Sequence, residues 1–329
     1  MKKLICAIAA LVGAVVAGVC AAPLKFNADG TFKIVQFTDL HYIADDPRAD
    51  IALERMAEVL DAERPDLVMI TGDLIFGKPA DASLRRVLDV VASRKYPFAV
   101  TFGNHDDELG LSRQQLLDII LTYPGNLTAT TPGLPGVTNY TLPVKSHDGT
   151  RDAEILYVLD SHSRCKLPGV GGYDYIKPAQ IDWYRTVSDA YTRANGGVPV
   201  PSLAFFHIAL PEYAQAAADQ AAVLHGFRKE KVCSPKLNSG LFLAMKEKGD
   251  VNGIFVGHDH DNDYAVMWNG ILLAYGRYTG GNTVYNNLTN GARIITLTEG
   301  RPGFTTWIRL KDGRIEQYSE FPKDFEKAK

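Results

Sequence analysis

Short apolar runs alternate with amphipathic segments through most of the chain, and this alternation constrains the fold more than any other feature. The apolar runs have the length of buried β-strands: Phe32–Thr38, Leu67–Thr71, Pro97–Phe102, Glu154–Asp160, Ser202–His207 and Gly253–Gly257. The segments between them carry apolar residues at helical spacing: Ala49–Arg64, Ala82–Arg94, Ser112–Leu121, Pro178–Ala194 and Ser239–Lys248. Alternating strands and helices predict a layered α/β architecture.

After Gly257 the helical pattern stops, and three runs are predicted to be mostly antiparallel strands: Ile271–Tyr275, Arg293–Leu297 and Phe304–Leu310. The segment Pro124–Pro143, rich in Gly, Pro and Thr, is expected to be a surface excursion. No internal repeat and no long linker divides the sequence, so we expect a single domain over residues 22–329.

The first 21 residues have the pattern of a secretory signal peptide. Two lysines precede the apolar run Leu4–Val19, and small residues lead to a cleavage position after Ala21. We therefore expect a mature chain in the periplasm or outside the cell, without a membrane span. The alternatives are an uncleaved anchor and a lipoprotein attached at Cys20, of which the bulky Val19 disfavours the second.

Composition restricts the partners more than the fold. The chain is 46% hydrophobic and 22% charged, with a formal net charge of −3. It therefore has no general attraction for nucleic acid or an anionic membrane, and an anionic substrate would need local positive charge such as bound metal ions. Only Cys165 and Cys233 follow the expected signal, and their spacing leaves a disulfide and two free thiols equally open.

Metal-ligating side chains follow five of the predicted strands. They lie in Asp39-Leu40-His41, Gly72-Asp73, Gly103-Asn104-His105-Asp106, His207 and Gly257-His258-Asp259-His260. Ligands of open α/β sheets bind beyond the carboxyl ends of the strands, so we expect one sheet to bring all five segments to one edge. A lone Gly-Asp is usually a turn and a lone histidine is usually structural, but five such segments in this order are hard to explain otherwise.

The residue types and their spacing indicate two metal ions. Residues two apart in extended chain face the same side, so Asp39 can share a site with His41, and His258 with His260. Imidazole and carboxylate without thiolate suit iron, zinc or manganese. A bridging carboxylate at Asp73 would hold two ions about 3.5–4 Å apart, the separation that clamps an in-line phosphoryl displacement.

This ordered set, from Phe32 to Asp263, resembles the calcineurin-like metallophosphoesterases, and within them the purple acid phosphatase-related branch with Asp-x-His as its first motif. The resemblance implies a central β-sandwich flanked by helices, with the site at one edge. It implies that one metal is held by Asp39, His41, Asp73 and His260, and the other by Asp73, Asn104, His207 and His258. His105 would contact the phosphate or act as a general acid, with Asp106 orienting it.

One position departs from the coloured purple acid phosphatases, in which a tyrosine three residues after the bridging aspartate ligates iron. Here that position is Phe76, and His41 supplies the ligand instead. The two-metal scaffold survives this change, but iron–tyrosinate chemistry does not.

Together these residues predict an exported hydrolase of phosphate monoesters or diesters, in which a water activated by the metals attacks phosphorus in line. The alternative is a non-catalytic metal-binding module, which would normally have lost a ligand, and none is missing. Weaker candidates are the triad-like Asp160-Ser161-His162, the segment Tyr275–Asn282 with Arg277 as a hairpin turn or a phosphate contact, and Asn262 with Asp263 as supports of the ligands.

Overall fold

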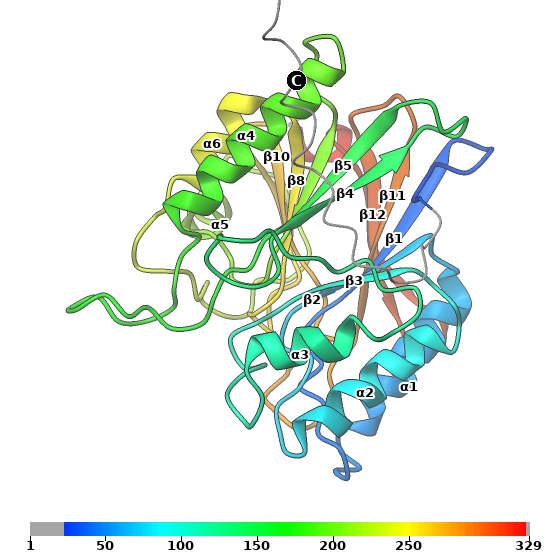
Figure 1. Ribbon diagram of the computed structural model, residues 1–329, viewed down its shortest axis with the longest axis vertical. Coiled ribbons are helices and arrows are strands. Elements are labelled where there is room, and N and C mark those ends of the chain that lie inside the picture. Colours follow the sequence, from blue (N-terminus) through cyan, green and yellow to red (C-terminus); the bar gives the residue numbers. More distant parts are fainter. Residues whose placement is uncertain (1–22, 327–329) are drawn as a thin grey trace, which may run out of the picture.

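The computed structural model describes residues 23–326, which form two β-sheets packed face to face between layers of helices (Figure 1). The first sheet has the order β13-β12-β11-β1-β2-β3 and the second β4-β5-β6-β8-β10-β9-β7. The strands of the first are β1 (Thr31–Phe37), β2 (Leu67–Thr71), β3 (Phe98–Thr101), β11 (Gly291–Thr298), β12 (Phe304–Leu310) and β13 (Ile315–Phe321). Those of the second are β4 (Tyr140–Lys145), β5 (Asp152–Val158), β6 (Ser202–Phe205), β7 (Leu224–His225), β8 (Val251–Val256), β9 (Ala265–Trp268) and β10 (Ile271–Tyr275).

The helices cover the two outer faces of the sandwich (Figure 1). The first sheet carries α1 (Asp50–Glu63), α2 (Ala80–Ala92) and α3 (Arg113–Ile120). The second carries α4 (Pro178–Ala194), α5 (Pro211–Ala218) and α6 (Leu241–Lys248). Two 3-10 turns, η1 (Lys311–Gly313) and η2 (Lys323–Phe325), follow β12 and β13. This sandwich flanked by helices confirms the predicted fold class.

The central strands are buried on both faces, which explains why they appear in the sequence as continuous apolar runs. In β2, Val68 and Ile70 pack against the helices, whereas Leu67 and Met69 pack between the sheets. Successive side chains of a strand point to opposite faces, so each strand contributes to two cores.

The peripheral elements differ from the expectation. The segment Pro124–Pro143 is not wholly a surface excursion, because β4 begins at Tyr140 and pairs antiparallel with β5. Tyr140 and Leu142 are buried between the sheets, while Pro143 is tolerated because β4 lies at the sheet edge. The strands after Gly257 are mostly antiparallel, as expected, and the one parallel pairing among them in the described residues is that of β10 with β8. The sequence pattern missed α5, the short strands β7 and β9, and the seven-residue edge strand β13.

The five ligand-bearing segments come from both sheets, which corrects the expectation that one sheet delivers them. Three follow β1, β2 and β3, and two follow β6 and β8 of the facing sheet. The sheets are joined at this edge by Gln36, whose Nε2 donates to the carbonyl of Val256 at 3.1 Å. No helix within residues 23–326 has the length and apolarity to cross a bilayer. The expected signal peptide lies outside the described residues.

Candidate metal centre

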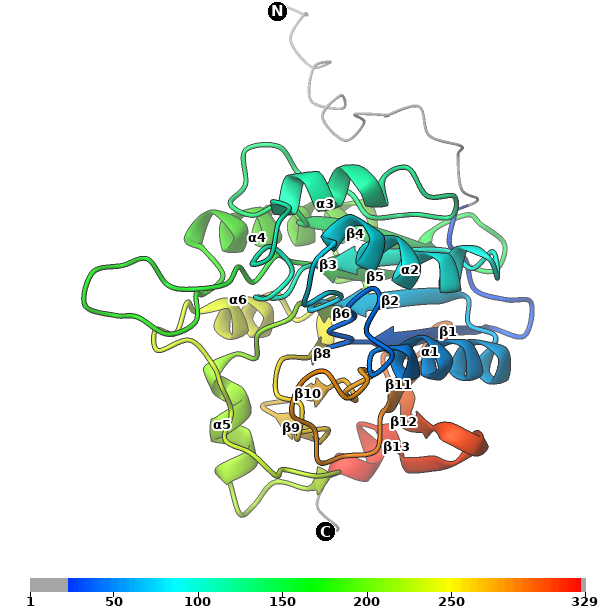
Figure 2. The ribbon, with the colours of Figure 1, turned by 90° about the horizontal axis from the view of Figure 1, so that it is seen from below.

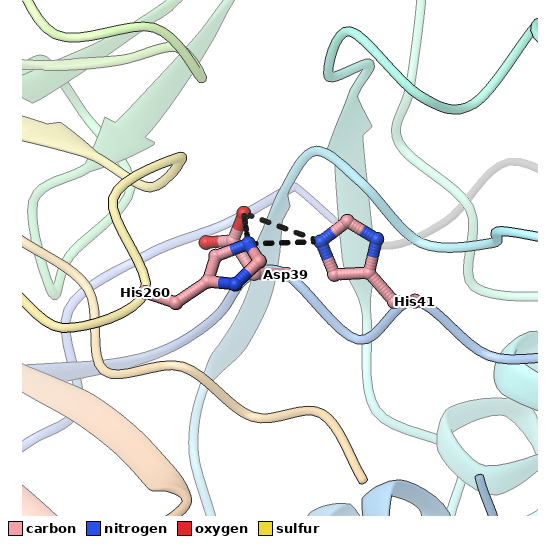
Figure 3. A group of neighbouring side chains, drawn as sticks. All are labelled: Asp39, His41 and His260. Atoms are coloured by element: carbon pink, nitrogen blue, oxygen red, sulfur yellow. Dashed lines mark hydrogen bonds and ion pairs between the residues drawn. The ribbon is translucent and has the colours of Figure 1, made fainter. Parts of the chain in front are cut away.

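The seven side chains expected to bind metal converge where these strands end, and none has more than 6% of its surface exposed. Six of them form two groups whose possible ligand atoms lie within 4.8 Å of one another. The first group, drawn in Figure 3, is Asp39, His41 and His260. The second is Asp73, His207 and His258. The seventh, Asn104, follows β3 at the same edge.

In the first group the imidazoles of His41 and His260 face each other, with 3.0 Å between their Nε2 atoms (Figure 3). Asp39 Oδ1 lies 3.7 Å from Nε2 of His260 and 4.0 Å from that of His41. His260 Nδ1 donates to the carbonyl of Tyr285 at 2.9 Å, so its Nε2 carries a lone pair. Two ring nitrogens this close can share a proton as a hydrogen bond, and they are also spaced to bind one metal ion as neighbouring ligands.

The carboxylate of Asp73 lies between the two groups. Its Oδ2 is 3.6 Å from His41 Nε2 and 3.2 Å from His207 Nε2. Its other oxygen accepts the backbone N–H of His105 at 2.8 Å. His207 Nδ1 donates to the carbonyl of Thr71 at 2.8 Å, which leaves its Nε2 lone pair facing Asp73. A carboxylate oxygen in this position is suited to bridging two cations.

Buried polar atoms without a hydrogen-bond partner gather at this edge. Among the described residues they include His41 Nδ1, Asp73 Oδ2, both amide atoms of Asn104, His207 Nε2 and His258 Nε2. Most buried polar groups of proteins are hydrogen-bonded, so such a concentration calls for a binding partner. Metal ions would satisfy Asp73 Oδ2, Asn104 Oδ1, His207 Nε2 and His258 Nε2 together, and this donor set fits a pair of them.

The electrostatics favour a cation at the same place. Burial lowers the pKa of His41 and of His258 well below the ordinary value, so both imidazoles are neutral and offer lone pairs. Burial opposes the ionisation of Asp73, yet His207 and His41 outweigh it and hold its pKa well below the usual range. Against its own burial, the Asp73 charge raises the pKa of His207 to about 9. A metal ion would take the place of that proton.

Several ligand residues have left-handed backbone conformations. Asp39, His41, Asp73 and His258 have φ values of 55°, 45°, 52° and 80°. The expectation of extended chain here is therefore wrong, although the paired side chains still share a site. Non-glycine residues in this region cost about 1–3 kcal/mol each when strained, and such residues cluster at functional sites. Backbone bonds between the loops hold the conformation: the N–H of Asp39 donates to Gly72 O at 3.0 Å, and that of His41 to Asp73 O at 2.9 Å.

At two positions glycine is required because atoms of a facing loop lie where a side chain would be, and not because the chain turns there. A Cβ at Gly103 would lie 2.1 Å from Asp73 Oδ1, and one at Gly257 would lie 1.9 Å from Thr38 Oγ1. Neither has a positive φ, so the backbone conformation itself does not demand glycine at these positions. Their missing side chains let the facing loops meet around the ligands.

Asp106 does not orient His105, which corrects the role that the family resemblance implied. Its carboxylate instead accepts backbone N–H groups of Asp73 at 3.0 Å, Leu74 at 2.7 Å and Gly103 at 2.7 Å. These bonds tie the loop after β2 to the loop after β3. Burial raises the pKa of Asp106 to about 6, with the neighbouring Asp73 charge adding to the effect.

The partner of His105 is Glu108, which sequence analysis missed. His105 Nδ1 lies 2.6 Å from Glu108 Oε2. The His105 ring is partly exposed, and its centroid is 5.4 Å from that of His41. The only sequence signal was a glutamate three residues after the histidine, which becomes meaningful once the chain is known to turn there.

The aromatic side chains around the first group offer no free phenolate. Phe76 packs edge-on against His41 and His105, at centroid distances of 5.6 and 4.8 Å. Tyr42 donates its hydroxyl to Asp50 at 3.2 Å. Tyr278 packs 4.9 Å from His260, but its hydroxyl donates to the carbonyl of Gly281 at 2.8 Å.

The weaker candidates have structural partners. Asp160 pairs with Arg113 at 2.6 Å, and His162 Nε2 lies 2.8 Å from Gln180 rather than beside Ser161. Arg277 pairs with the buried Asp263, away from the ligands. Asn262 accepts backbone N–H groups of Lys229 and Glu230, so it supports that loop. Cys165 and Cys233 are free thiols.

Comparisons with known proteins agree with this geometry. The profile described as calcineurin-like phosphoesterase matches residues 32–262. "Probable inactive purple acid phosphatase 29" of Arabidopsis thaliana is 33% identical, covering 89% of this chain and 85% of that protein. "Phosphatase DCR2" of Saccharomyces cerevisiae is 34% identical, covering 87% of this chain and 55% of that protein. A crystal structure of a dimetal phosphatase from Danio rerio shares the fold, with a TM-score of 0.60 at 14% identity over 88% of this chain and 99% of that chain.

The matched residues include strands of both sheets and all five segments that carry the clustered aspartate, asparagine and histidine side chains. The relatives named as purple acid phosphatases 29 and 14 of Arabidopsis thaliana, which align along most of the chain, are both named probable inactive. Sequence, fold and site thus agree, and the chain belongs to the calcineurin-like phosphoesterase family.

Proposed function

We propose that residues 22–329 form one exported domain that hydrolyses phosphate monoesters or diesters at a dinuclear metal centre. The observation that carries the proposal is the position of Asp73 Oδ2, which is buried without a hydrogen-bond partner between the imidazoles of His41 and His207. A non-catalytic module would need neither this bridge nor a partly exposed histidine beside it.

In this proposal the first ion is held by Asp39, His41, Asp73 and His260, and the second by Asp73, Asn104, His207 and His258. The ions are iron, manganese or zinc, and they would supply Lewis acidity and a water of lowered pKa. His105 donates a proton to the leaving oxygen of the ester. Glu108 anchors Nδ1 of that ring, and Asp106 holds the ligand loops together through their backbone.

The bridge is tested by replacing Asp73 with asparagine. An amide lacks the anionic charge that two cations share, so Asp73→Asn should lower metal content and turnover together. Metal analysis and hydrolysis of a panel of monoesters and diesters measure the two quantities. Asp189→Asn, which alters a half-exposed carboxylate paired with Lys248, is the matched control and should change neither. Two metals per chain at wild-type turnover in Asp73→Asn would refute the bridging role.

The His105 variant separates binding from chemistry. His105→Ala should keep its metals, while turnover falls about 100- to 10,000-fold, the usual contribution of a general acid. The fall should be smaller for esters with good leaving groups, which need less protonation. Glu108→Gln retains the ring and should lose less activity. Loss of metal from His105→Ala would instead make His105 a ligand. Full metal content with no hydrolysis of any ester by the wild type would favour the non-catalytic module.

Colour tests the assignment of His41. A purple band arises from a phenolate bound to ferric iron, but Phe76 has no oxygen and the Tyr42 and Tyr278 hydroxyls are already hydrogen-bonded. The iron-loaded enzyme should therefore be active without an intense visible band. A neutral imidazole in place of a phenolate should also favour divalent manganese or zinc. Spectra and turnover after loading with each metal provide the measurement, and a band abolished by Tyr278→Phe would overturn the assignment.

Export is tested by the mature N-terminus. Cleavage after Ala21 should give a chain that begins at Ala22 in the periplasmic or secreted fraction. N-terminal sequencing of that fraction is the measurement. A chain that begins at Met1 would contradict cleavage, and lipid labelling that is lost in Cys20→Ala would establish the lipoprotein alternative.

A further inference from the structure

Two loops beside the metal centre, here called the basic loops, carry an excess of positive charge. They are residues 164–173, between β5 and α4, and residues 226–238, between α5 and α6. Their cations are Arg164, Lys166, Arg228, Lys229, Lys231 and Lys236. The only carboxylate among them is Glu230, so their formal charge is 6 − 1 = +5, whereas the whole chain has −3.

These cations are not used to pair with carboxylates. Within residues 23–326 none of the six forms a salt bridge, although Arg48, Arg113 and Lys248 elsewhere do so. Arg228 and Lys236 donate to the backbone carbonyls of Ala217 and Val170. The charges of the basic loops therefore remain available to an external anion.

The first basic loop reaches the second metal group through one aromatic ring. Tyr173 lies edge-on to His258, with 4.2 Å between the ring centroids. The guanidinium of Arg164 lies over the Tyr173 ring, 4.6 Å from the centre of that ring. This cation–π contact holds the guanidinium beside the ring that touches His258, and within the described residues the guanidinium pairs with no carboxylate.

The second basic loop is attached to the segment that bears His258 and His260. The N–H of Cys233 donates to Asp259 at 3.2 Å, and Glu230 accepts the N–H of Asp261 at 2.6 Å. Glu230 also accepts the Tyr285 hydroxyl at 3.0 Å, and that ring stacks on His260 with a centroid distance of 4.5 Å. The exposed Lys231 lies in the sequence between the two attached residues, Glu230 and Cys233.

The two loops form one rim. Lys236 Nζ of the second donates to Val170 O of the first at 2.7 Å. Figure 2 shows the first loop, in green, projecting from the body near α6, with the chain that follows α5 passing on the same side. The rim therefore places Arg164 and Lys231 on the side of the centre where His258 and His260 lie.

We propose that Arg164 and Lys231 bind a second phosphate of the substrate, so that the preferred esters carry an anionic group in addition to the phosphate that is cleaved. This inference rests on the proposed function, which places the cleaved phosphate at the metals. Arginine and lysine form charge-assisted hydrogen bonds to phosphate oxygens, and two such contacts beside the centre select for a bisphosphate over a monophosphate.

The test compares adenosine 3′-phosphate with adenosine 3′,5′-bisphosphate, two esters that differ by one phosphate. Binding is measured by calorimetry on the manganese-loaded protein in a His105→Ala background, in which the ligands are cleaved slowly, and turnover is measured in parallel with His105 intact. In the Arg164→Ala/Lys231→Ala variant the Kd of the bisphosphate should rise about tenfold, or about 1.4 kcal/mol, while that of the monophosphate stays within about twofold. Added salt should weaken bisphosphate binding to the wild type more than to the variant.

The control variant is Arg193→Ala/Arg301→Ala, which removes the same charge from exposed positions at the far end of the sandwich, in the last turn of α4 and after β11. It should leave both Kd values unchanged. An equal change for the two ligands in the loop variant, no change for either, or an equal effect of the control would overturn the proposed subsite. Absence of turnover with every ester would count against the proposed function alone, because the Kd comparison decides the subsite independently.

Discussion

The buried carboxylate of Asp73 is the constraint on which the rest of the site depends. One oxygen is fixed by the backbone N–H of His105, and the other faces two imidazoles from opposite sheets at 3.6 and 3.2 Å. An anion in such surroundings persists only where positive charge compensates the loss of water. The surrounding loops are arranged to provide that compensation, since they place His207, whose pKa the Asp73 charge raises to about 9, against the carboxylate and exclude solvent.

The backbone around Asp73 is held in place by contacts that leave little room for variation. Asp106 binds N–H groups of the loops that follow β2 and β3, and Gly103 lets those loops approach to a distance that a Cβ would forbid. The left-handed conformations of Asp39, His41 and Asp73 make the loops costly to form, so the sandwich must stabilise them. Both sheets contribute through their buried faces, which is why a site built from five loops can be rigid.

Sequence reasoning predicted the parts of the fold that are fixed by local pattern. The bounds of β2, β10, β12 and α4 are those expected, because doubly buried strands and a long amphipathic helix leave clear signatures. It did not predict that the ligands come from two sheets, since the packing of one sheet on another has no local signal. Glu108 was missed for the same reason, because its contact with His105 depends on how the chain turns after Asn104. Edge strand β4 alternates buried and partly buried residues and contains Pro143, and half of α5 is alanine, so neither has a continuous apolar run or a clear amphipathic pattern.

Charge balance connects the ligand set to the kind of substrate that the centre would accept. Of the seven proposed ligands, only Asp39 and Asp73 are carboxylates, and the imidazole of His41 is neutral. Two divalent ions would therefore leave a net charge of about +2 at the centre, which a phosphate monoester dianion matches.

Such a surplus attracts anions without regard to the rest of the molecule, so discrimination among phosphate esters must come from groups around it. The cations of the basic loops, which form no salt bridges within the described residues, lie among the groups beside the metal centre. The chain as a whole carries a negative charge. Attraction is thus confined to one side of the centre, and the geometry of the loops, rather than the metals, would decide which anions remain bound.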